Sequence, residues 1–384
     1  MKITYLTLVL VAGALTFTSC KKKGCTDPTA VNYDPNAEKN DGSCEEGPAG
    51  PSYTVPTTYT FTDANGNNTV AYQGQTDRLN QLSEMTTLMG TGTSAPVDAQ
   101  VLKDMYANVG DNGNGNFSFT STKQLKNKTF PADQALFESW MDDFALASQS
   151  HAMTASDGQA GTLTTGSGST YLFDENGIEH KQFIEKGMMG ATFMYQALVV
   201  YFGDGKMDVD NTTAEDPANG KYYTEMEHHF DEAFGYFGVD VDFPANIPNR
   251  FWGKYCNQQD PLINCNADMM DNFLKGRAAI TGNVLADRDA AISAIRTEWE
   301  DISAYQAVKY INDCLNYFGS DNAAFLHALA EAYAFAWNLR YAPTETRRMT
   351  TTEHADLMAL FPTNFWNTTI TDLNNIKNTI EAKY

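Results

Sequence analysis

Apolar residues recur with helical periodicity over most of this 384-residue chain. Ile295, Trp299 and Ile302, for example, follow one another at spacings of four and three residues, which places them on one face of a helix. Thr224 and Glu227 form a capping box that marks a helix start. Strand periodicity is nearly absent. The predicted class is therefore all-α, either one helical bundle or two packed helical bundles.

The predicted elements can be placed along the chain from these signals. A short strand is predicted at residues 59–62, and polar, glycine-rich loops are predicted at 65–68, 111–116 and 157–169. Gly187 and Gly190 would let a second helix approach closely. The predicted helices span residues 76–89, 97–106, 132–148, 178–202, 225–237, 267–281, 287–318, 322–341, 352–360 and 371–382.

The amino-terminal segment predicts export and lipidation. After Met1 and Lys2, residues 6–17 form an apolar run that is too short to span a membrane. The small residues before Cys20 resemble a bacterial lipoprotein signal, in which the cysteine is acylated and the preceding segment is removed. We therefore expect a lipid-anchored protein of the cell envelope, on the periplasmic face of the outer membrane or on the cell surface. A plain signal peptide, with Cys20 in a disulfide, is the alternative.

The other cysteines fit an oxidising compartment. Cys25 and Cys44 bracket one polar segment, and Cys256 and Cys265 bracket another, so two local disulfides are predicted. Cys314 has apolar neighbours and is expected to be a buried free thiol.

Residues 25–44 resemble a short Cys-bracketed module that is common in exported proteins of Bacteroidetes-type bacteria. A small stapled spacer is the main interpretation. Its Asp27, Asp34 and Asp41 leave weak calcium binding open, although their spacing does not fit an EF-hand. The predicted organisation is a signal peptide (1–19), then the anchor, module and linker (20–58), then an all-helical domain (59–384).

The charge balance excludes one class of partner. The chain has 26 Lys and Arg residues against 48 Asp and Glu residues, for a formal net charge of −22. Such a surface repels the phosphate backbone, so no nucleic-acid partner is expected. It keeps the protein soluble and attracts cations.

Histidines and glutamates on three predicted helices are the candidate chemical groups. Glu225, His229 and Glu232 stand one above another along the edge of one apolar helix face. Imidazole nitrogens and carboxylate oxygens are metal ligands, and helical bundles assemble metal sites from facing helices. Iron or another divalent metal is the predicted cofactor. The candidate ligands are His180, Glu225, His229, Glu232, His327 and Glu331.

Other readings of these residues stay open. Each histidine taken alone is more typical of a hydrogen-bonded core residue than of a metal ligand. Inward His or Met residues could also hold haem without a covalent link. The sequence has no GxSxG elbow, HExxH helix, Walker loop or Rossmann glycine pattern. We therefore expect no enzyme, and a metal-dependent hydrolase is the third hypothesis.

Three stretches carry a resemblance to a known group: the helix around His180, the helix around His229, and Phe-Trp-Gly-Lys-Tyr at 251–255. They resemble an uncharacterised, domain-of-unknown-function family of Bacteroidetes-type lipoproteins, over residues 59–384. That family is distantly similar to imelysin-like proteins, which are exported, all-helical and associated with iron acquisition. His229 and Glu232 reproduce the HxxE part of their GxHxxE motif, but Glu227 replaces the glycine.

Two functions follow as expectations. The first is a metal (iron) or haem binding component of an uptake system, working with a TonB-type transporter. The second is a structural or interaction lipoprotein that supports an outer-membrane transporter without ligand chemistry. Convergence of His180, His229 and His327 in space would favour the first function.

Overall fold

The chain forms two compact units, Met1–Ser52 and Tyr53–Tyr384. The computed structural model describes residues 21–28, 30–45, 53–246 and 249–384. Cys20 and the predicted signal segment lie outside the described residues, so lipidation stays a prediction. The second unit begins a little before the predicted start at residue 59.

The amino-terminal unit is a small stapled module. Strands β1 (Lys23–Gly24) and β2 (Lys39–Asn40) pair in parallel. The predicted disulfide between Cys25 and Cys44 is present. A cross-link of this kind stabilises a segment that has too few apolar residues for a core of its own.

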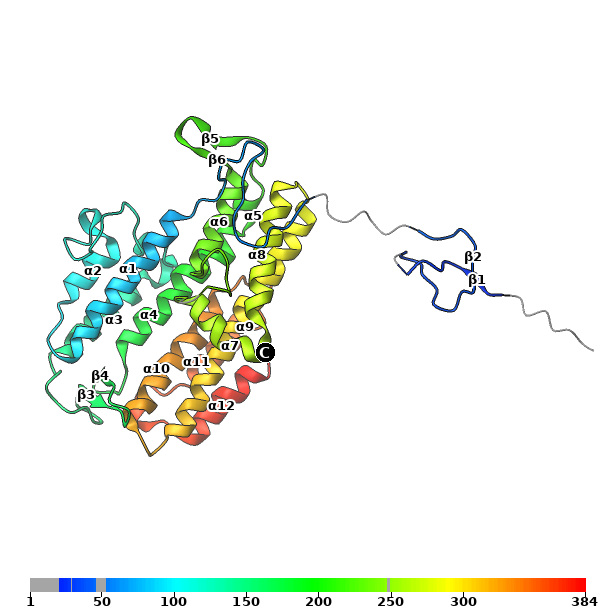
Figure 1. Cartoon of the computed structure of the whole chain (residues 1–384). Helices are drawn as coiled ribbons and strands as arrows, with labels where there is room; N and C mark the ends of the chain where they lie inside the picture. The colour runs from blue at the N-terminus through cyan, green and yellow to red at the C-terminus, as the bar shows by residue number, and fades with distance from the viewer. Residues whose placement is uncertain (1–20, 29, 46–52, 247–248) are drawn as a thin grey trace, which may run out of the picture. The chain divides into compact units, whose positions relative to one another are not determined.

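The second unit is built of helices that pack side by side (Figure 1), which confirms the all-α class. The longest helix, α9, packs against α8, α10 and α12. Among the described residues, no helix has the length and apolar character needed to cross a membrane. The helices are α1 (Gln73–Gly90), α2 (Ala99–Ala107), α3 (Gln134–Ser148), α4 (His180–Met188), α5 (Asp204–Met207), α6 (Glu225–Phe237), α7 (Trp252–Ile263), α8 (Cys265–Thr281), α9 (Leu285–Tyr317), α10 (Asn322–Asn338), α11 (Thr351–Ala359) and α12 (Ile370–Glu381).

Local sequence signals account for the start and the buried face of these helices. Thr224 Oγ1 accepts a hydrogen bond from the Glu227 backbone N–H at 3.2 Å, and Glu227 Oε2 accepts one from the Thr224 N–H at 3.0 Å. The predicted capping box is therefore confirmed. Ile295, Trp299 and Ile302 are fully buried, as their helical spacing predicts.

Two hairpins interrupt the helices in segments without a strand prediction. Strand β3 (Gly161–Thr164) lies within the loop predicted at 157–169 and pairs antiparallel with β4 (Thr170–Phe173), which follows that loop. Strands β5 (Ala214–Asp216) and β6 (Lys221–Thr224) form the second hairpin, just before α6. Segments this short carry too little alternation to be recognised from sequence.

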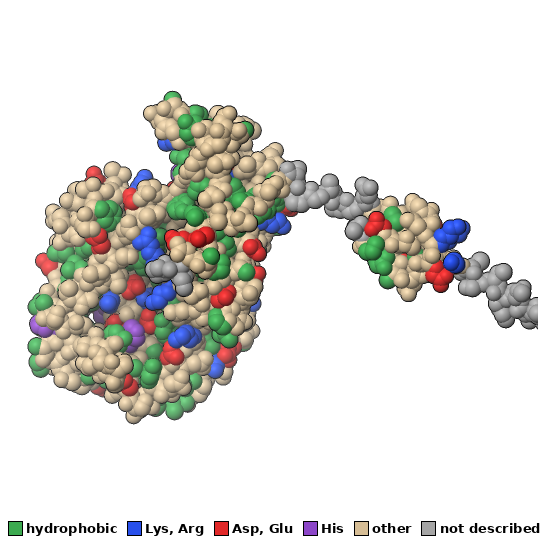
Figure 2. All heavy atoms as spheres, in the orientation of Figure 1, with side chains coloured by type: hydrophobic (Ala, Val, Ile, Leu, Met, Phe, Trp, Pro, Cys, Tyr) green, Lys and Arg blue, Asp and Glu red, His purple; other side chains and the backbone are tan. Residues whose placement is uncertain are grey.

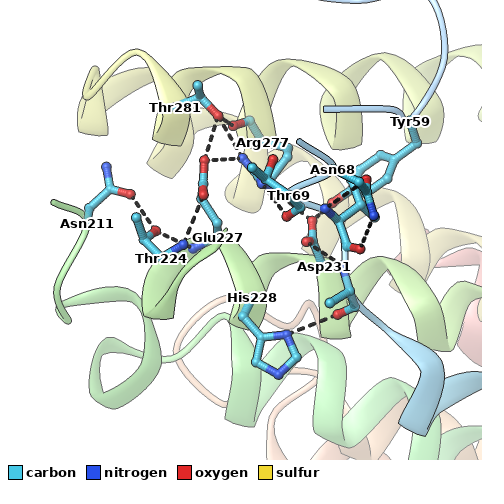
Figure 3. A network of polar contacts seen from close by, with 12 residues as sticks. Tyr59, Asn68, Thr69, Asn211, Thr224, Glu227, His228, Asp231, Arg277 and Thr281 are labelled. Atoms are coloured by element: carbon cyan, nitrogen blue, oxygen red, sulfur yellow. Dashed lines mark hydrogen bonds and ion pairs between the residues drawn. The ribbon is translucent and has the colours of Figure 1, made fainter. Parts of the chain in front are cut away.

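The strand predicted at 59–62 is wrong, because isolated backbone and side-chain hydrogen bonds hold this segment in place of a strand ladder. Apart from one bridge at Thr62, it forms no ladder within the described residues. Its Tyr59 hydroxyl donates to Asp231 Oδ1 at 2.9 Å. Figure 3 shows Asp231 and Glu227 on α6 joined to Arg277 on α8, which also donates to the Thr69 carbonyl oxygen.

The predicted Cys256–Cys265 disulfide is not formed, and the structure holds both as buried free thiols. Cys256 lies inside α7, where no helix was predicted, and Cys265 begins α8. Asn264, with φ of 56°, turns the chain between the two helices. The Cys265 thiol donates to the Cys256 carbonyl oxygen at 2.9 Å. Cys314 is buried and free, as predicted.

The predicted helix at 178–202 is continuous, but its winding changes. After α4 it continues through two π-helical segments, Met189–Met194 and Gln196–Tyr201. The π-helix is rare and often marks a functional site. At Gly190 an added Cβ would lie only 2.0 Å from Asn338 Oδ1 of α10. This contact confirms the predicted close approach of a second helix.

Candidate functional site

On α6, the candidate metal ligand His229 forms hydrogen bonds to Glu232 and to Lys206. His229 Nδ1 lies 3.1 Å from Glu232 Oε2, and His229 Nε2 lies 3.2 Å from Lys206 Nζ. Because an ammonium group can only donate, Nε2 is an acceptor here and Nδ1 is the donor. Burial alone would raise the pKa of Glu232, but the His229 hydrogen bond and neighbouring donors lower it to about 2. Glu225 lies further away, at 3.5 Å from Nε2.

The predicted pair on α10 belongs to a second cluster, at the start of α4. His327 Nδ1 lies 2.6 Å from Glu179 Oε2, and its Nε2 lies 3.4 Å from Glu331 Oε2. Burial favours the neutral ring, but the carboxylates of Glu179 and Glu331 outweigh it and raise the pKa of His327. His180 pairs separately, with its Nε2 3.0 Å from Asp174 Oδ2.

The three histidines do not converge on one point. His180, and Glu179, with which His327 pairs, lie at the start of the long helix that begins with α4. The His229 ring lies beside Tyr201, at the other end of that helix. At about 1.5 Å per residue, the two ends are separated by a distance on the order of 30 Å. The structure thus brings Glu225, His229 and Glu232 together, and separately His327 and Glu331.

Within the described part of the chain, no group of three or more His, Cys, Asp and Glu side chains is arranged to hold a metal ion. In the amino-terminal module, Asp34 pairs with Lys22 at 2.7 Å, and Asp41 accepts hydrogen bonds from Ser43. Acidic side chains are scattered over the face of the helical unit seen in Figure 2. The negative charge is therefore spread out and does not form one cation site on this face.

A pocket of about 580 Å³ lies where α10, α11 and the π-helical segments meet. Small-molecule sites typically enclose roughly 300–1,000 Å³ and combine apolar walls with a few polar groups. This pocket has both features. Its lining includes the aromatic residues Phe130, Tyr195, Trp337 and Tyr341, the charged residues Arg340, Glu345 and Arg347, and, on α11, Thr351, His354, Ala355 and Met358.

Three separate segments supply the aromatic walls. Phe130 and Tyr195 meet edge to face, with ring centroids 5.0 Å apart. Trp337 Nε1 donates to the Tyr341 hydroxyl at 2.9 Å, and that hydroxyl donates to Asp133 Oδ2 at 2.5 Å. These bonds hold the rings in fixed orientations, so the pocket is preformed.

The π-helical winding places one wall of the pocket. Tyr195 lies between the two π-helical segments, so the winding sets the direction in which its ring leaves the helix. Side-chain donors meet the helix where the winding changes. Trp252 Nε1 donates to the Met189 carbonyl oxygen at 2.7 Å, and Asn338 Nδ2 donates to the Lys186 carbonyl oxygen at 2.9 Å. Such donors satisfy acceptors at irregular points of a helix.

Two arginines give the pocket positive charge. The Arg340 guanidinium lies over the Trp337 ring, 4.4 Å from its centroid. His354, in the same pocket, donates from Nε2 to the Ala336 carbonyl oxygen at 3.1 Å. Burial above all, and then the nearby Arg340 and Arg347, lower the pKa of His354 to about 4, although the hydrogen bond to Ala336 acts the other way.

The lowered pKa of His354 predicts a loss of stability in acid. The unfolded imidazole takes up a proton near pH 6.5, whereas the folded protein resists protonation until about pH 4. This contribution is complete above the unfolded pKa and is lost as pH falls through that window, by roughly 3 kcal/mol in all. Denaturant unfolding at about pH 7 and about pH 4.5 measures it.

His354→Gln is the matched variant, because its amide keeps a donor for Ala336 but does not titrate. The difference in unfolding free energy between the two pH values should shrink by about 2–3 kcal/mol in this variant. The same pH dependence in both proteins would contradict the assignment.

The sequence indicates this pocket only weakly. Its walls come from segments near residues 130, 195, 340 and 354, which no local pattern relates to one another. The signal that exists is the crowding of Trp337, Arg340 and Tyr341 at the end of one predicted helix.

The fold and the pocket define an all-α protein with a cavity of small-molecule size between its helices. The chain belongs to the DUF4856 family, because the model of this domain of unknown function matches residues 56–384. No curated protein and no solved structure matches the chain. The match confirms the predicted relation to a domain-of-unknown-function family, and it shows no link to lipoproteins or imelysin-like proteins.

Proposed function

We propose that this protein is an exported, lipid-anchored binding protein that holds a small organic ligand in the pocket between α10, α11 and the π-helical segments. The observation that carries the proposal is the preformed cavity of about 580 Å³ with aromatic walls. Residues that bind and orient a ligand suffice for this role, and we propose no catalysis. Delivery of the ligand to an outer-membrane transporter, such as a TonB-type system, is the corresponding role in the cell envelope.

Haem fits this proposal better than a bare metal ion does. The predicted metal-ligand histidines His180, His229 and His327 pair with carboxylates of the protein at separate places, and His229 also pairs with Lys206. The flat aromatic body of haem suits the aromatic rings of the pocket, and its carboxylates suit the arginines. His354 and Met358 also line the pocket, and His and Met side chains can ligate haem iron. Haem is therefore one member of the ligand class to be tested.

The second candidate is a structural or interaction lipoprotein. The observation that favours it is that the histidines His180, His229 and His327 are partnered within the protein, as core polar residues are. This function predicts that the pocket binds no ligand with useful affinity.

Titration with the fluorescent dye N-phenyl-1-naphthylamine separates the two functions. The protein is the full chain with Cys20→Ser, which blocks the predicted lipidation and removes the need for detergent. We expect saturable binding of one dye per chain with a Kd in the micromolar range. Haemin is titrated in parallel by absorbance.

Two alanines on α11 provide a matched pair of variants. Ala355 is exposed and lines the pocket, whereas Ala359 is exposed on the same helix and does not line it. Ala355→Trp should fill the cavity and weaken dye binding at least about tenfold, and Ala359→Trp should leave it unchanged. Absence of one-to-one binding, or an equal effect of both variants, would favour the structural role.

A further inference from the structure

We infer that the ligand of this pocket carries a carboxylate, which Arg347 and Thr351 bind at one end of the aromatic cavity. This inference rests on the proposed function and specifies the chemical class of its ligand: a flat apolar body with an acidic group.

The guanidinium of Arg347 has an unused donor. Its Nη1 donates to the Arg340 carbonyl oxygen at 3.0 Å, and its Nη2 donates to Thr351 Oγ1 at 2.5 Å. Its Nε is buried and has no hydrogen-bond partner in the described parts of the protein. Among the described residues, no other arginine nitrogen is both buried and without a partner. A buried donor left unpaired costs free energy, so a ligand acceptor that displaces the atoms covering Nε would relieve that cost.

The position of the free donor suits a carboxylate. Nε and Nη2 form one edge of a guanidinium, the edge that binds both oxygens of a carboxylate. The Thr351 hydroxyl accepts from Nη2, which leaves its own proton free to donate to the same ligand. Arg347 and Thr351 both line the pocket, so the three donor groups are adjacent.

No carboxylate of the protein takes this place. Over the described residues, no Asp or Glu oxygen lies within ion-pair distance of Arg347; Arg340 has Asp133 at 3.7 Å. Glu345 also lines the pocket, but it is exposed and accepts from the Thr344 hydroxyl at 3.1 Å. Both arginines contribute to the low pKa of His354, which shows that their positive charge is felt within the cavity.

The test compares 2-naphthoate with 2-naphthamide, its uncharged isostere, by calorimetric titration of the Cys20→Ser full chain. We expect naphthoate to bind about 10- to 100-fold more tightly than naphthamide, as a charge-assisted, two-point hydrogen bond allows. Arg347→Met should abolish this preference and leave naphthamide binding within about twofold of the unsubstituted protein. Arg347→Lys should retain part of the preference, because it keeps the charge without the bidentate edge.

Arg348→Met is the matched control, because Arg348 is adjacent in sequence but pairs with Asp301 and does not line the pocket. It should keep the full preference. If naphthoate and naphthamide bind equally, the carboxylate inference is overturned and the pocket remains a ligand site. If neither compound binds, the proposed function fails and the inference fails with it. If Arg347→Met does not fold, Thr351→Val supplies the same comparison, and an unchanged preference there would count against the inference.

Discussion

Replacing Arg277 by methionine is expected to lower the free energy of unfolding by about 3–5 kcal/mol. The Arg277 side chain is fully buried. Its Nη1 lies 2.7 Å from Glu227 Oε1, and its Nε lies 2.9 Å from Asp231 Oδ1 (Figure 3). The substitution leaves two carboxylates buried without a counter-charge, and it also removes a donor to the Thr69 carbonyl oxygen.

The pH dependence of this effect has a definite sign. Burial already raises the pKa of Asp231 to about 6, even though Arg277 favours its charged form. Without Arg277 the folded pKa of Asp231 rises further, and a raised carboxyl pKa lowers stability as pH increases through the window between the unfolded and folded values. Below about pH 6 both proteins change alike, so the cost of Arg277→Met should grow as pH rises above about 6, the folded pKa of Asp231 in the unsubstituted protein.

Denaturant unfolding of both proteins at several pH values measures this cost. Arg348→Met is the matched control, because its ion pair with Asp301 is partly exposed and should contribute about 1 kcal/mol or less. A loss below about 1 kcal/mol for Arg277→Met would show that the network is not a main source of stability.

Replacing Trp252 by alanine is expected to cost about 3–5 kcal/mol of unfolding free energy. Trp252 is fully buried and packs edge to face against Trp299 and Phe335, each with ring centroids 5.9 Å apart. Its indole N–H also donates to the Met189 carbonyl oxygen, where the α winding gives way to the π winding. The variant therefore loses packing and leaves an acceptor unpaired at the helix that carries Tyr195.

Phenylalanine variants separate these two contributions. Trp252→Phe keeps most of the ring but loses the donor, so it should cost about 1–2 kcal/mol beyond the loss of ring volume. Trp366→Phe is the matched control, because the Trp366 indole nitrogen is buried without a hydrogen-bond partner among the described residues. Trp252→Phe should also weaken dye binding in the pocket, and Trp366→Phe should not. Equal costs for the two variants would contradict a role of Trp252 in holding the π-helical winding.

Local sequence signals predict most of the helices in the second unit. The stripe that contains Trp299, the capping box of Thr224 and Glu227, and the close approach at Gly190 are all present in the structure. These features depend on residues within a turn or two of one another, or on the size of one residue. Periodicity and capping therefore suffice to predict them.

The candidate site could be predicted only in part. The sequence places His229 beside Glu232 on one helix, and the structure confirms that contact. The sequence could not show that Lys206 would hydrogen-bond to the Nε2 atom of His229. It also could not show that His327 would pair with Glu179, which lies far from it in the sequence. These pairings join separate elements, so they depend on how the helices pack.

The all-α class, most helix starts and the Cys25–Cys44 staple could be predicted from the sequence, because each follows from residues close together in the chain. The π-helical winding, the free state of Cys256 and Cys265, and the pocket near Arg347 depend on how the helices pack. A cavity is the space left between packed side chains from distant segments. Its shape and charge therefore come from packing, which no local pattern encodes.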